Sequence, residues 1–308
     1  MSANDWTYVV FGILILLALI FDLGLLSKKS RKVSIKQALV QTVFWVSLAV
    51  GFFIFIGFED GKTQALEYIS AYLMEWSLSI DNIFVFILVF TYFGVAEEYY
   101  NRVLLLGILL AIFLRIIFIT VGVVLVQEFA WLLYLFGGFL VYTGIKMFLI
   151  NDEHEFDPEK NPVYRLINKF VPLTNNISDG NFYKIIDGKK YYTTLFIVLV
   201  MLATTDIVFA LDSIPAVFAI TQTKMIIYTS NIFAVLGLRS LFFLLHGAVN
   251  KFRYLKEGIA VVLIFIGLKM LIEYFGIHIP IWVSLLVIVC CISGSILSSA
   301  FKPKERGR

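Results

Sequence analysis

Charged residues are scarce in this sequence of 308 residues. Asp, Glu, Lys and Arg together make up only 15% of it, whereas a typical soluble domain has about 25%. Hydrophobic residues make up 60%, and the mean hydropathy is +0.90. This composition excludes an ordinary soluble domain and predicts an integral membrane protein.

Residues with thiol or imidazole chemistry are also few. The two cysteines, Cys290 and Cys291, are consecutive, and the three histidines are scattered without an HExxH motif. Such spacing predicts neither a zinc site nor a disulfide framework. The sequence also lacks the GxxxxGK[ST] phosphate loop of ATP-driven proteins. We therefore expect no required cofactor and no nucleic-acid partner.

Long hydrophobic runs dominate the rest of the chain. A helix that crosses a bilayer needs about 17–25 apolar residues. Nine runs have this character: 6–27, 38–57, 67–93, 102–126, 129–150, 193–220, 225–247, 257–275 and 280–300. They are continuous rather than alternating, which excludes the strands of a membrane barrel. The expected fold is all-α, with nine transmembrane helices.

The basic residues predict the orientation of these spans. With the N-terminus outside, the short inner segments hold thirteen Lys and Arg residues, whereas the outer segments hold only Lys62 and Lys224. Positive charge gathers on the cytoplasmic side, so we expect the N-terminus out, the C-terminus in, and a multi-pass protein of the inner (plasma) membrane.

The long connection 151–192 is then cytoplasmic. It opens with Asp152, Glu153, His154 and Glu155. These side chains are able to bind a metal ion, but a solvated charge run is the favoured reading. Near its end, Asp187-Gly188 between β-prone residues predicts a hairpin.

An internal repeat places acidic residues inside the spans. The stretch "EWSLSIDN" (75–82) aligns with "DIVFALDS" (206–213), so that Glu75 falls on Asp206 and Asp81 on Asp212. Further along, Arg115 aligns with Arg239, and then "GIKM" (144–147) aligns with "GLKM" (267–270). Three matches in the same order indicate a duplication.

The duplicated units hold three spans each. A unit with an odd number of spans enters the membrane from opposite sides when it is repeated in tandem, which predicts an inverted-repeat transporter. The expected segments are an N-terminal two-helix segment, the first repeat, the cytoplasmic loop, the second repeat, and a final helix with a basic tail: 1–66, 67–150, 151–192, 193–275 and 276–308.

The charges of the repeats do not balance. An ionisable side chain at bilayer depth costs about 2.5–3.5 kcal/mol on insertion scales, so it marks a functional site. The four repeat acids exceed the two repeat arginines by two formal charges. A divalent cation would supply the difference, and protonation of the acids is the alternative. Carboxylate, amide and hydroxyl oxygens suit Mg²⁺, Ca²⁺ or Mn²⁺.

Pro215, three residues after Asp212, favours a break in its helix. Such a break would turn Asp212 toward the other acids and would expose carbonyl oxygens, as in the discontinuous helices of transporters.

The motifs "EWSLSIDNIFVF", "DIVFALDSIPAVFAIT" and "TSNIFAVLGLRSLFFLL" closely resemble the TerC family of bacterial membrane proteins, over residues 10–300. The family takes its name from tellurium resistance, is associated with manganese efflux, and is grouped with LysE-type exporters. The resemblance implies a metal site made of acidic and amide side chains, with these candidates: Glu75, Asp81, Asn82, Asp206, Asp212 and Asn231. Asp22 matches a family acid in the first span and is a supporting residue. Arg115 and Arg239 lie too deep in their spans to reach the membrane surface, so we expect them to support the site by pairing with the acids.

Two functions remain open on these grounds. The first is a secondary-active Mn²⁺ exporter, not an enzyme, that works by alternating access with protons as counter-ion. The second is a membrane scaffold without transport of its own. It would assist either the metal loading of exported proteins or the response to metal or tellurium stress. A third, an intramembrane protease, lacks the expected flanking signatures. The sequence does not predict the oligomeric state.

Overall fold

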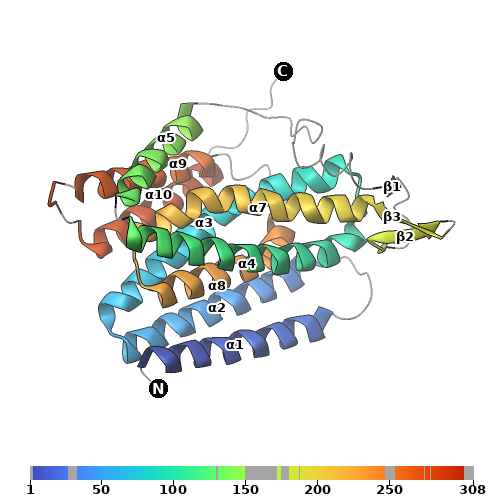
Figure 1. Ribbon diagram of the computed structural model, residues 1–308, viewed down its shortest axis with the longest axis horizontal. Helices are drawn as coiled ribbons and strands as arrows, with labels where there is room; N and C mark the ends of the chain where they lie inside the picture. Colours follow the sequence, from blue (N-terminus) through green and yellow to red (C-terminus); the bar gives the residue numbers. More distant parts are fainter. Residues whose placement is uncertain are drawn as a thin grey trace.

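The computed structural model describes residues 3–26, 33–129, 131–149, 172–174, 180–186, 188–246, 254–273, 275–277 and 279–301. These residues form nine helices and one small sheet, and several of the long helices lie side by side along the long axis of the molecule (Figure 1). The helices are α1 (Ala3–Leu26), α2 (Ile35–Glu59), α3 (Lys62–Tyr92), α4 (Glu97–Glu128), α5 (Leu132–Leu149), α7 (Thr194–Phe218), α8 (Lys224–His246), α9 (Leu255–Glu273) and α10 (Ile281–Phe301). The strands are β1 (Leu173–Thr174), β2 (Tyr183–Ile186) and β3 (Lys189–Thr193).

Six of these helices are long and apolar enough to cross a membrane, namely α2, α4, α5, α7, α8 and α10. Helix α1 holds a shorter apolar stretch, Trp6–Ile20. Helix α9 is not among the six, and its apolar run is interrupted by Lys256, Glu257 and Lys269. The helical membrane fold is therefore confirmed, whereas nine spans and inverted repeats stay predictions.

Local sequence signals fix where the first helices begin and end. Ser34 caps α2 by accepting a hydrogen bond from the amide of Gln37, and the Gln37 side chain accepts one from the amide of Ser34. This reciprocal pair satisfies two amides that the helix itself cannot. Gly61 (φ 101°) and Gly94 (φ 57°) then adopt backbone conformations that favour glycine. They make the tight turns from α2 to α3 and from α3 to α4.

Helix α8 forms the centre of the bundle. It packs against α2, α3 and α4, and most of its side chains are buried. Phe233 of α8 lies 5.4 Å from the ring of Phe52 on α2 and 6.4 Å from the ring of Tyr68 on α3. These aromatic contacts hold α2, α3 and α8 together beside the charged residues described below.

The backbones of helices α5 and α9 approach each other closely. A Cβ atom on Gly267 would lie 2.6 Å from the carbonyl oxygen of Gly137, and one on Gly144 would lie 2.8 Å from the carbonyl oxygen of Ala260. Glycine lets two helix backbones approach this closely in a membrane. Because 137 meets 267 while 144 meets 260, the two helices run antiparallel.

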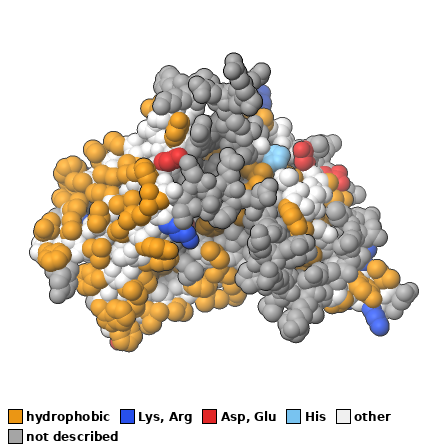
Figure 2. Space-filling model, turned by 90° about the horizontal axis from the view of Figure 1, so that it is seen from above, with side chains coloured by type: hydrophobic (Ala, Val, Ile, Leu, Met, Phe, Trp, Pro, Cys, Tyr) orange, Lys and Arg blue, Asp and Glu red, His pale blue; other side chains and the backbone are white. Residues whose placement is uncertain are grey.

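The outer surface is rich in large hydrophobic side chains. Figure 2 shows them gathered over one end of the molecule, the end at which Figure 1 places α5, α9 and α10. Leu149 of α5 is 74% exposed and Trp282 of α10 is 59% exposed. Apolar exposure on this scale suits a lipid-facing surface rather than an aqueous one.

The small sheet extends past the ends of α4 and α7 (Figure 1). Its strand order is β1-β3-β2, with β2 and β3 antiparallel and Ile186 paired with Lys189 across the turn at Gly188. Strand β3 runs directly into α7. Arg102 of α4 donates a 2.6 Å hydrogen bond to the carbonyl of Gly180, just before β2. The hairpin thus ties the ends of α4 and α7 together.

Candidate functional site

An arginine joins acidic side chains from two helices in the interior. Arg115 of α4 binds Asp206 of α7 through two hydrogen bonds, from Nε to Oδ2 at 2.6 Å and from Nη2 to Oδ1 at 2.9 Å. Its Nη1 contacts Oε1 of Glu75 on α3 and donates to Oδ1 of Asn231 on α8 at 3.1 Å. The network therefore joins four helices and both predicted repeats.

The members of this network are shielded from solvent. Glu75 is 0% exposed, Asp206 1%, Arg115 2% and Asn231 2%. With both carboxylates ionised, the single guanidinium leaves one negative charge uncompensated within the network. Buried charges are costly unless they are paired and hydrogen-bonded. A further cation or a proton would complete the charge balance.

Buried oxygen atoms without hydrogen-bond partners lie along α3 beside this network. Within the described part of the chain, Oε2 of Glu75, Oγ of Ser79 and Oδ1 of Asn82 have none. Positions 75, 79 and 82 share one face of a helix. Buried polar atoms are almost always paired, so these three oxygens are candidate ligands for a water molecule or a cation.

Other serines of α3 do have hydrogen-bond partners. Ser70 and Ser77 donate to the carbonyl oxygens of Leu66 and Leu73, four residues earlier, at 2.7 Å and 2.5 Å. Ser79 makes no such bond among the described residues. On α7, Oγ of Ser213, which aligns with Asn82 in the repeat, is buried and also lacks a described partner. Oxygen donors are thus available on both helices.

Several predicted site residues are placed only by their helices. Asp22 lies in α1, Asp81 in α3 and Asp212 in α7, but their side chains are outside the described ones. Arg239 of α8 is 4% exposed and has interaction partners. The described side chains hold no group of three His, Cys, Asp or Glu residues able to share a metal ion.

The predicted break at Pro215 is wrong. Helix α7 continues through Pro215 to Phe218, and the amide of Ala219 still bonds to the carbonyl of Pro215 at 3.1 Å. Proline removes one backbone donor, and near a helix end in a membrane bundle that loss is tolerated. Asp206 and Asp212 therefore lie on one continuous helix. At 100° per residue, side chains six residues apart lie about 120° apart around a helix, so these two acids occupy different faces.

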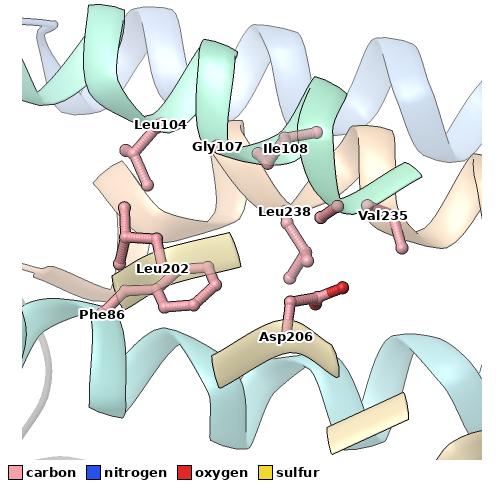
Figure 3. A pocket seen from close by; sticks show the side chains of 9 residues that line it. Phe86, Leu104, Gly107, Ile108, Leu202, Asp206, Val235 and Leu238 are labelled. Carbon is pink, nitrogen blue, oxygen red and sulfur yellow. The ribbon is translucent and has the colours of Figure 1, made fainter. Parts of the chain in front are cut away.

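A small cavity adjoins Asp206 (Figure 3). Its volume is about 10 Å³, which is room for one water molecule. Aliphatic and aromatic residues from four helices surround it, and Asp206 is the one charged residue in its lining: Phe86, Leu104, Gly107, Ile108, Ala111, Leu202, Asp206, Val235 and Leu238. Apart from Asp206, the lining of this cavity is apolar.

Comparison with known proteins decides the family. The model of the integral membrane protein TerC family matches residues 60–307. This chain belongs to the TerC family. The resemblance inferred from the repeat motifs is thereby confirmed.

TerC relatives match almost the full length of this chain. The "Uncharacterized membrane protein STKORF319" of Myxococcus xanthus is 44% identical over 304 residues, which cover 99% of this chain and 94% of the relative. An uncharacterized membrane protein of Rickettsia bellii is 39% identical over 296 residues, with coverage of 96% and 97%. The Salmonella typhi protein named "Putative membrane-bound redox modulator Alx" is 39% identical over 307 residues, with coverage of 97% and 95%. No solved structure matches this chain.

Sequence reasoning had not singled out Ser79 in this TerC chain. Serine is common in membrane helices, where its hydroxyl usually bonds to the carbonyl four residues earlier. The available signal was its position four residues after Glu75, which places both side chains on one face of α3. The pairing of Arg115 with one acid from each repeat was likewise not specified by the sequence.

Proposed function

We propose that this TerC protein is a secondary-active exporter of divalent cations, with Mn²⁺ as its substrate and protons as counter-ion. The observation that carries the proposal is the buried network in which Arg115 joins Glu75 and Asp206, one acid from each repeat. Substrate sites of inverted-repeat transporters lie at the repeat interface near the bilayer midplane. In this reading the protein acts as a transporter in the inner membrane rather than as an enzyme.

The pairing of helices supports the inverted repeat. The repeat alignment makes Gly144 the counterpart of Gly267, and Gly137 the counterpart of Ala260. Exchanging the repeats therefore turns the Gly137–Gly267 contact into the Ala260–Gly144 contact, and both contacts are present. A pseudo-two-fold axis between antiparallel α5 and α9 accounts for this. Helix α3 also packs against α8, as its counterpart α7 packs against α4.

Further oxygen donors on α3 and α7 suit a hard divalent cation. A carboxylate oxygen of Glu75, the hydroxyls of Ser79 and Ser213, and the amide oxygen of Asn82 are buried and lack described partners. Oxygen ligands of this kind favour Mg²⁺, Ca²⁺ and Mn²⁺ over softer metals. The family resemblance narrows this set to Mn²⁺. Asp81 and Asp212 stay predicted ligands.

Arg115 would act as a placeholder for the cation. While the site is empty, its guanidinium pairs with both Glu75 and Asp206 and compensates one of their two negative charges without a metal. An arriving divalent cation would compete with the guanidinium for the same oxygens. Alternating access requires that occupied and empty sites favour different helix arrangements, and an exchange of this kind between Arg115 and Mn²⁺ supplies such a difference.

A membrane scaffold without transport of its own is the second candidate. The β2–β3 hairpin favours it, because Ile185 is 70% exposed at a position beyond the helix ends. A scaffold would use this surface to bind another protein. Neutralising one buried acid would leave the function of a scaffold intact, provided that the protein stayed folded.

Mn²⁺ flux into proteoliposomes separates the two candidates. Wild type, Asp206→Asn and Asp212→Asn would be reconstituted with an Mn²⁺-quenched dye inside, with and without a pH gradient. Saturable wild-type flux that both variants lose would support the exporter. Tyr142→Phe, at an exposed position of α5, provides the control. A folded wild type without flux under either condition would contradict the proposal and favour the scaffold.

A further inference from the structure

Polar side chains form a continuous stripe on α3, leading from one helix end to the ion-pair network. At 100° per residue, its members fall within about 80° of one another around the helix. They are Gln64, Tyr68, Tyr72, Glu75, Ser79 and Asn82. From Gln64 to Glu75 the stripe is about 16 Å long at 1.5 Å per residue. With the proposed orientation, it covers the outer half of the membrane.

Unsatisfied polar atoms mark this stripe over its whole length. Besides the three oxygens described above, Oε1 of Gln64 and the hydroxyl of Tyr68 are buried and have no partner among the described residues. Tyr68 is 0% exposed and Tyr72 4%. A buried tyrosine hydroxyl normally has a hydrogen-bond partner. Among the described residues, five of the six stripe members thus have a buried oxygen without a partner, whereas the other carboxylate oxygen of Glu75 contacts Arg115.

Aromatic contacts hold the two tyrosines in line. Their rings are stacked, with centroids 6.3 Å apart and planes 10° apart. Phe52 and Phe233 both meet the Tyr68 ring edge-on. Packing thus fixes the ring of Tyr68 while its hydroxyl is left without a partner.

The matching stripe on α7 is different in chemistry. Its positions are Leu195, Leu199, Ala203, Asp206, Ala210 and Ser213. Between the start of α7 and Asp206 it carries no polar side chain, and the small cavity beside Asp206 lies on the same side, walled by Leu104 and Leu202. The α3 stripe, on the outer side of the site, is thus polar, whereas the equivalent positions of α7, on the inner side, are apolar.

Acidic side chains lie near the outer end of the stripe. Glu67, three residues after Gln64, accepts a 2.5 Å hydrogen bond from the hydroxyl of Thr221, just beyond α7. Asp60 precedes α3 and has a buried oxygen without a described partner. Carboxylates at the mouth of a path attract cations.

We propose that the exported cation leaves the site along this α3 stripe, where the oxygens of Tyr72, Tyr68 and Gln64 replace part of its hydration on the way out. This inference rests on the proposed export function. It makes Tyr68 and Tyr72 release-path residues, not ligands of the resting site. The apolar counterpart on α7 then seals the cytoplasmic side while the outer path is in use.

Tyr68→Phe tests the path because it removes one hydroxyl and keeps the ring. We expect maximal Mn²⁺ flux in proteoliposomes to fall about tenfold, the effect of one hydrogen bond to a charged group. Equilibrium Mn²⁺ binding in detergent should be unchanged. Tyr100→Phe is the matched control, because Tyr100 is a buried tyrosine of α4 that lies away from the stripe and packs on Phe90.

The outcomes separate this inference from the function on which it rests. Normal flux in Tyr68→Phe, or an equal loss of flux and affinity, would overturn the release path. If Glu75→Gln still abolished flux, the exporter itself would stand. Absence of flux from the folded wild type would instead overturn the exporter, and the path with it.

Labelling at the stripe's outer end gives a test that does not depend on the folding of Tyr68→Phe. In a background with Cys290→Ser and Cys291→Ser, Gln64→Cys should react with a membrane-impermeant maleimide from the outer side, and the adduct should block flux. Lys62→Cys is the control, because Lys62 lies on a different face of α3, beside the open groove with Phe58. If labelling of Gln64→Cys left the flux unimpaired, the proposed release path would be overturned.

Discussion

Replacing Arg115 by Gln tests whether the two carboxylates hold a cation. The change leaves Glu75 and Asp206, which are 0% and 1% exposed, without their shared guanidinium. Removing one partner of a buried ion pair costs about 3–5 kcal/mol, because the other charge stays buried and unpaired. We expect Arg115→Gln to lose about this much free energy of unfolding in metal-free buffer.

Mn²⁺ should restore much of this loss, because a divalent cation is able to take the place of the guanidinium. A ligand at one hundred times its Kd stabilises the folded state by about 2.7 kcal/mol. The gain should be larger in Arg115→Gln than in wild type, where Mn²⁺ must first displace Arg115 from two hydrogen bonds to Asp206. Chemical unfolding in mixed micelles, followed by tryptophan fluorescence with and without Mn²⁺, measures both values.

Arg102→Gln is the matched control on the same helix. It removes a 2.6 Å hydrogen bond to the carbonyl of Gly180 and the contact of the guanidinium with the Phe182 ring, which together contribute about 1–2.5 kcal/mol. Mn²⁺ should not restore that loss, because no acid is left unpaired. Equal stabilisation of Arg115→Gln and wild type by Mn²⁺, or none in either, would refute the exchange of arginine for metal.

Three further predictions concern single sites. Ser79→Ala should weaken Mn²⁺ binding about tenfold, because the cation loses one oxygen ligand. Ser77→Ala should not weaken it, because the Ser77 hydroxyl already bonds to the carbonyl of Leu73. Isothermal titration compares the two variants, and equal affinities would exclude Ser79 as a ligand. Gly267→Ala should lower the free energy of unfolding by about 1–3 kcal/mol, because the added methyl group overpacks against Gly137. Gly138→Ala should leave it unchanged, because the space around Gly138 is open. Equal stability of the two variants would contradict the close contact. The double variant Cys290→Ser and Cys291→Ser should keep full Mn²⁺ flux, and loss of flux would show that transport requires a thiol.

The positions of the helices could be predicted from the sequence. The run 225–247 became α8 at Lys224–His246, and the run 193–220 became α7 at Thr194–Phe218. Continuous apolar runs bounded by polar residues leave little choice in a bilayer, where each backbone group must be satisfied within its own helix. Proline was the misleading signal: Pro215 suggested a break, but α7 absorbs it near its C-terminal end.

The partners within the site could not be predicted in the same way. The repeat alignment named Glu75, Asp206 and Arg115, but it gave no distance between α3, α4 and α7. Those helices meet through packing of residues far apart in sequence, such as Gly107 of α4 against Leu202 of α7. Ser79 escaped notice because its difference from Ser77 is one of hydrogen bonding, not of residue type.

The use of arginine at position 115 is itself an argument for a switching role. A buried ion pair is often less stable than a well-packed hydrophobic replacement, so stability alone does not explain it. The planar guanidinium binds Asp206 through two nitrogens and still reaches Glu75 and Asn231 with the third. A lysine offers a point charge without this forked geometry. The helices α3, α4, α7 and α8 are therefore joined at one cation, and any motion that separates the repeats must break this junction. In the proposed exporter, a substrate that took over the carboxylates would free Arg115 and remove the contact that opposes the motion, which would link occupation of the site to opening of the interface.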